Sequence, residues 1–159
     1  MMMQTNLGVV LLSVTLLGAG CGLNGTGNPV SDATEFRATV TGDAERPDPV
    51  DTEATGTGTF TLNADETQLS YSISILGLSG DVTGAHFHFS ADGAAGSGEI
   101  VFAITDMIVN DGNGGATAEG VWNLSAEDVL NLRLDYIYVN FHTDANPAGE
   151  IRGNLVPAS

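Results

Sequence analysis

Three histidines are the side chains best suited to chemistry in this chain of 159 residues, and all of them lie in two short segments. His86 and His88 flank Phe87, and His142 follows Phe141. Side chains alternate between the two faces of an extended strand, so His86 and His88 share one face and leave Phe87 on the other. If the two segments are neighbouring strands and the three imidazoles hold one copper or zinc ion, their nitrogens should converge to within about 4 Å.

Two interpretations of these histidines remain open. In the first they bind metal, and Glu150, Asp144 or Asp92 lies nearby as a further ligand. In the second they are structural, and hydrogen bonds to Glu150, Tyr138 or backbone carbonyls hold adjacent strands in register. Because short motif matches are often coincidental, the sequence by itself slightly favours the structural interpretation.

Other kinds of site find little support. A two-metal site of the copper–zinc superoxide dismutase type needs more histidines than this chain has, and a blue-copper site needs a cysteine thiolate. The segment 111–115 is similar to part of a calcium loop but lacks the acidic residue that closes an EF-hand, so we expect a hairpin turn there. No serine lies in a nucleophile motif, and no glycine-rich phosphate loop is found. These absences favour a non-enzymatic binding or structural module.

The first twenty residues carry no charge, and residues 7–20 form an apolar run of the length found in signal peptides. Residues 16–21 resemble a lipobox, so we expect Cys21, the only cysteine, to be acylated and to anchor the protein to a membrane. The following residues are rich in Gly, Asn and Thr and predict a flexible tether over 21–33. The folded domain is then expected over 34–157, in the cell envelope, outside the cytoplasm.

The charge balance is strongly acidic. Twenty Asp and Glu residues face four Arg and no Lys, which gives a net charge of −16. A nucleic-acid partner is excluded, because such binding needs a basic surface. Acidic chains without lysine suit high-salt surroundings, where charge repulsion is screened, so a halophilic source fits this composition.

Short alternating segments separated by Gly, Asp and Asn turns predict an all-β fold. We expect an antiparallel Greek-key β-sandwich of about eight strands with one short helix. The helix should begin after Ser125 as N-cap, with Val129, Leu130 and either Leu132 or Leu134 packed on the sheet. A turn over 110–115 should join the fifth strand directly to the sixth. The expected strands cover residues 35–41, 55–62, 68–76, 82–89, 99–105, 117–124, 135–142 and 150–156.

Four sequence blocks are similar to those of the chordin (CHRD) domain family. They are residues 41–45 (TGDAE), 85–88 (AHFH), 138–143 (YVNFHT) and 147–153 (PAGEIRG). The resemblance covers residues 35–156 and is most specific in the last two blocks. It implies an extracytoplasmic β-sandwich domain, here as a single-domain microbial lipoprotein. In animal chordin such domains belong to a secreted antagonist of growth-factor signalling, a role that does not follow from the fold alone.

Overall fold

The computed structural model describes residues 31–91 and 98–158, which form one antiparallel sheet of ten strands and one α-helix. The leader, Cys21 and most of the tether lie outside the described residues. The eight expected strands are all present, with ends within about two residues of the predicted ones. The elements are β1 (Glu35–Thr41), η1 (Gly42–Ala44), β2 (Thr55–Leu62), β3 (Gln68–Leu76), β4 (Val82–Phe89), β5 (Glu99–Ala103), η2 (Thr105–Met107), β6 (Ile108–Asn110), β7 (Ala116–Asn123), α1 (Ala126–Arg133), β8 (Ile137–Thr143), β9 (Ile151–Asn154) and β10 (Val156–Pro157).

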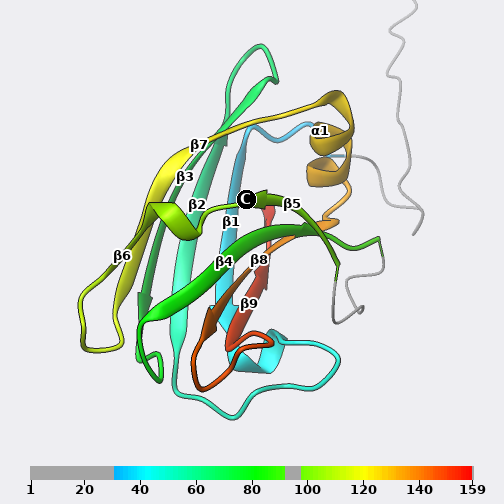
Figure 1. Ribbon diagram of the computed structural model, residues 1–159. Coiled ribbons are helices and arrows are strands. Elements are labelled where there is room, and N and C mark those ends of the chain that lie inside the picture. Colours follow the sequence, from blue (N-terminus) through cyan, green and yellow to red (C-terminus); the bar gives the residue numbers. More distant parts are fainter. Residues whose placement is uncertain (1–30, 92–97, 159) are drawn as a thin grey trace, which may run out of the picture.

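The strands follow the order β5-β4-β8-β9-β1-β2-β3-β7-β6, and β10 pairs with β1. β1, β2 and β3 are consecutive antiparallel neighbours. The other side of β1 pairs with β9, which lies near the end of the chain. The sheet curls, so that β4 passes in front of β1 and β2 and the two halves face one another as in a sandwich (Figure 1). The prediction of an all-β antiparallel fold with one short helix is therefore confirmed.

The core lies between the two halves and is built by alternation along the strands. In β3, for example, Leu69, Tyr71, Ile73 and Ile75 are buried while the residues between them are exposed. Phe87 of β4 crosses the core, because its ring contacts Phe60, Tyr71, Phe102 and Trp122 from the other strands. Trp122 is buried as well. This packing fixes one face of β4 inward and therefore fixes His86 and His88 on the outer face.

Helix α1 begins with the expected cap and lies at one end of the curled sheet (Figure 1). The Ser125 hydroxyl accepts a hydrogen bond from the Asp128 amide, and the Asp128 carboxylate accepts one from the Ser125 amide. Val129 and Leu132 are buried, as predicted. The prediction for Leu130 was wrong: it is half exposed, because positions 129 and 132 already fill the face turned to the sheet.

The region between β5 and β7 differs from the prediction. The turn at 110–115 does not follow the fifth strand directly, because η2 and the short strand β6 intervene. The hairpin turn therefore joins β6 to β7, while β5 pairs with β4 at the other edge of the sheet. Within the described ranges, no helix is long and apolar enough to cross a membrane.

Candidate metal centre

The three histidines are brought together by the antiparallel pairing of β4 with β8. In this register His86 lies opposite Asn140, His88 opposite Tyr138, and Gly84 opposite His142. His142 is therefore the diagonal neighbour of His86 on the outer face of adjacent strands. Diagonal neighbours in a sheet lie within reach of long side chains, so the register alone explains why the two rings meet.

Gly84 lies beside the rings of His142 and His86. A Cβ atom at Gly84 would lie 3.4 Å from Cδ2 of His142 and 3.5 Å from Cε1 of His86. The ring centroids of His86 and His142 are 5.2 Å apart, and those of His86 and His88 are 5.5 Å apart. A side chain at position 84 would therefore contact the rings of both His86 and His142.

The ligand nitrogens of the three histidines face one another. Nδ1 of His86 and Nε2 of His142 form a hydrogen bond of 3.3 Å, and one nitrogen from each ring lies within 4.8 Å of the others. Two nitrogens bound to one zinc or copper ion can be no more than about 4.2 Å apart, since each bond is about 2.1 Å long. The closest pair already meets this limit. The full set is wider than the expected 4 Å and needs a small ring movement to close on an ion.

Backbone carbonyls orient two of the rings. Nδ1 of His88 donates to the carbonyl of Gly98 at 3.0 Å, and Nδ1 of His142 donates to the carbonyl of Pro147 at 3.1 Å. With the proton held on Nδ1, the lone pair of a neutral imidazole lies on Nε2. Such outer contacts are what metal-binding histidines use to fix ring and tautomer.

Nε2 of His88 is buried and has no hydrogen-bond partner in the protein. His88 itself is only 7% exposed. Buried polar atoms are nearly always paired, so an unpartnered one calls for a ligand or a water molecule. A purely structural histidine would be expected to use both ring nitrogens.

Tyr138 and Arg152 form a stack beneath His88. The rings of His88 and Tyr138 are nearly parallel, at 5°, with centroids 4.8 Å apart. The Tyr138 hydroxyl accepts a hydrogen bond from the amide of Gly98. The carbonyl of the same glycine accepts the hydrogen bond from Nδ1 of His88. The guanidinium carbon of Arg152 lies 3.4 Å from the centre of the Tyr138 ring. His88 is therefore held in place through both its ring face and its Nδ1 atom.

Burial lowers the pKa of all three histidines below the ordinary value. For His86, the neighbouring His142 and His88 lower the pKa further. For His88, the Gly98 carbonyl and the nearby Asn140 side chain oppose the effect of burial on the pKa, and the charge of Arg152 adds to it. For His142, the Pro147 carbonyl opposes the effect of burial. A lowered pKa favours the neutral ring, which is the state in which imidazole binds metal.

The other candidate ligands do not join the cluster. Glu150 is fully buried and accepts hydrogen bonds from Thr52, Ser79 and Thr143. Among the described residues, neither Glu150 nor Asp144 belongs to the group formed by the three histidines. Asp92 and Cys21 lie outside the described residues.

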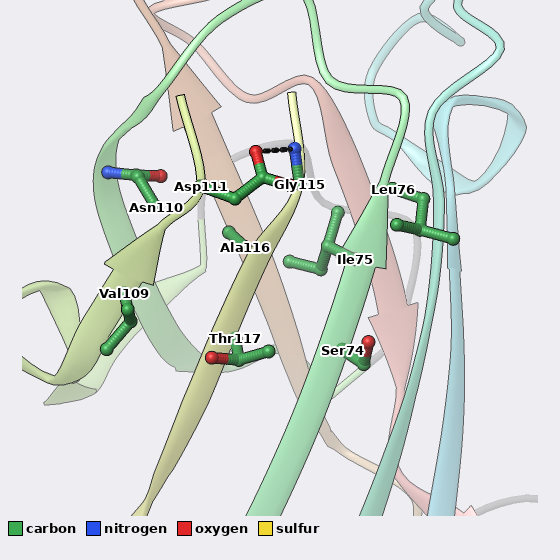
Figure 2. Close-up of a pocket in the computed structure, with 9 residues that line it drawn as sticks. All are labelled: Ser74, Ile75, Leu76, Val109, Asn110, Asp111, Gly115, Ala116 and Thr117. Atoms are coloured by element: carbon green, nitrogen blue, oxygen red, sulfur yellow. Dashed lines mark hydrogen bonds between the residues drawn. The ribbon is translucent and has the colours of Figure 1, made fainter. Parts of the chain in front are cut away.

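A separate pocket of about 230 Å³ lies over β3, β6 and β7, strands that do not carry the histidines (Figure 2). Leu76 and Val109 line it and are 65% and 67% exposed. Asp111 is the one acidic residue among its lining residues. Its carboxylate accepts hydrogen bonds from the amide of Asn113 and from that of Gly115, the second of which is drawn in Figure 2. Asp111 therefore closes the β6–β7 turn, as the hairpin interpretation of 111–115 predicts.

Sequence reasoning identified the histidines but missed the residues that position them. The contribution of Gly84 is the absence of a side chain, and Gly98 and Pro147 contribute backbone carbonyls. Motifs made of side chains do not reveal contributions of either kind. The stacking of Arg152 on Tyr138 had a usable signal, because both residues fall on outward positions of neighbouring strands. Asn140 lies directly opposite Arg152, and its Oδ1 is also buried without a hydrogen-bond partner.

Comparison with known proteins gives one match. A family model described as the CHRD domain matches residues 36–155. No curated protein and no solved structure matches the chain. The matched segment contains all three histidines and every strand from β1 to β9 apart from the first residue of β1.

Proposed function

Since the chain belongs to the CHRD domain family, we propose that it is a non-enzymatic binding module that holds one copper or zinc ion through His86, His88 and His142. The observation that carries this proposal is the buried Nε2 atom of His88, which has no partner while Nδ1 is held by Gly98. Three neutral imidazoles suit copper and zinc, and they leave a coordination position open for a further ligand.

The proposal also includes the location of the domain. Acylation of Cys21 would place the module on the outer side of a membrane, with residues 22–33 as its tether. A module of this kind would act outside the cytoplasm. Its role would be to hold or deliver metal in the cell envelope.

Equilibrium dialysis of the untagged domain tests metal binding. We expect one equivalent of copper or zinc per chain, and we expect His88→Ala to weaken the affinity about 100-fold, because it removes the most buried ligand. Asp144→Asn is the matched control, since it removes an exposed carboxylate close to His142 without touching the cluster. Equal loss in both variants would assign the bound metal to the acidic surface and contradict the proposal.

Membrane fractionation tests the anchor. We expect the wild-type protein in the membrane fraction and a Cys21→Ala variant in the soluble extracytoplasmic fraction, because a diacylated cysteine is the attachment point that a lipobox specifies. A variant that stays with the membrane would show that another part of the protein holds it there.

A further inference from the structure

Resting on the metal site proposed above, we propose that this site binds copper as Cu(I) in preference to Cu(II) and to other divalent ions. The structural reason is the combination of a ligand set without negative charge and a buried cation, Arg152, stacked behind it.

The position of Arg152 brings its charge close to the site. Arg152 is 1% exposed, and its guanidinium carbon lies 3.4 Å from the Tyr138 ring centre, which lies 4.8 Å from that of His88. These two distances place the guanidinium within about 8 Å of the His88 ring. Unit charges at such a distance in a protein change a binding constant by about tenfold.

The charge on Arg152 is permanent, because a guanidinium does not lose its proton in proteins. Its field opposes any cation bound at the His88 ring, and it opposes a doubly charged ion about twice as strongly as a singly charged one.

The ligands do not offset this positive charge. His88 and His142 keep their protons on Nδ1 for the carbonyls of Gly98 and Pro147, so they bind as neutral donors. Among the described residues, no carboxylate belongs to the cluster. Cu(II) would bring two positive charges into a partly buried site that already has one beside it, whereas Cu(I) brings one and accepts a small number of ligands.

Two sets of negative charge act in the opposite direction. The net charge of −16 favours divalent cations, but exposed carboxylates act through water and are screened at high ionic strength. Glu45 is buried against Gly149, and burial raises its pKa to about 7, although the charges of Arg152 and Arg46 oppose this. When ionised, Glu45 weakens the field of Arg152.

The test compares Cu(I) and Cu(II) affinities of the untagged domain by competition with chelators of each ion. We choose pH 8, where Glu45 is ionised, and an ionic strength of about 1 M set with sulfate, where the Debye length is about 3 Å. The wild type should bind Cu(I) more tightly than Cu(II). Arg152→Gln should lower the ratio of the two affinities about tenfold, which is a fall of about 59 mV in the one-electron reduction potential. Glu45→Gln should raise the ratio.

Arg37→Gln is the matched control, because it removes the same charge from an exposed position of β1. An equal ratio in the Arg152→Gln and Arg37→Gln variants, or tighter binding of Cu(II) by the wild type, would overturn the inference. If Arg152→Gln does not fold, Glu45→Gln decides, and an unchanged ratio there would overturn it. Failure of the metal site itself is distinct, because then neither copper ion nor zinc would bind in a way that depends on His88.

Discussion

Saturating the domain with the ion that dialysis shows to bind is expected to raise its free energy of unfolding by about 4 kcal/mol, at a free metal concentration about 1,000 times the dissociation constant. Metal bound only by the folded state stabilises it by mass action. The His86, His88 and His142 nitrogens come from two strands and meet only when β4 pairs with β8. For a domain of this size the gain corresponds to a rise in melting temperature of about 10–20 °C. Thermal unfolding followed by circular dichroism measures it.

The control separates the cluster from the acidic surface. His88→Ala should lose most of the metal-dependent rise, whereas Asp144→Asn should keep it. Repeating the measurement at high salt should leave the rise in place, because screening weakens exposed carboxylates far more than a partly buried site. A rise of equal size in His88→Ala would contradict binding at the three histidines.

Replacing Glu150 with alanine is expected to destabilise the domain by about 3–5 kcal/mol. The carboxylate is fully buried and accepts four hydrogen bonds, two from Ser79, one from Thr52 and one from Thr143. These partners come from the loop before β2, the loop before β4 and the end of β8. Alanine would leave the buried hydroxyl of Thr143 and the partly buried donors of Thr52 and Ser79 without this acceptor. Denaturant unfolding measures the loss.

A matched variant, Glu150→Gln, keeps the shape and one acceptor oxygen, so its cost should be clearly smaller. The pH dependence gives a second check. Burial raises the pKa of Glu150, but the hydrogen bonds from Ser79, Thr143 and Thr52 outweigh it and hold the pKa below its usual range. A carboxylate with a lowered pKa stabilises the fold above its unfolded-state pKa, and this contribution is lost as the pH falls through the folded-state pKa. Equal acid sensitivity of wild type and Glu150→Gln would contradict this role.

Most of the fold could be predicted from alternation alone. The period-two patterns of β2 and β3 match strands with one face in the core, and their predicted ends agree with the structure. The same pattern placed His86 and His88 on one face and Phe87 on the other. β6 and β10 escaped prediction because strands of two or three residues are too short to show a period.

The site was harder to predict, because its character depends on contacts between distant segments. Tyr138 and Asn140 share the outer face of β8 with His142, but both are buried. Glu150 was considered as a ligand on the assumption that the last strand begins there. In the structure β9 begins at Ile151 and Gly149 has φ of 130°, so the alternation does not extend to Glu150. Its carboxylate instead meets Ser79 and Thr143.

The most direct test of the central claim is the X-ray absorption spectrum of the copper-loaded domain. Binding by His86, His88 and His142 predicts a first shell of three nitrogen atoms at about 2 Å with the outer scattering of imidazole rings, and it predicts a smaller imidazole contribution, from two rings, in His88→Ala. A shell of oxygen atoms without imidazole scattering, or the same spectrum in His88→Ala, would show that the metal lies elsewhere and that the three histidines serve only to hold β4 against β8.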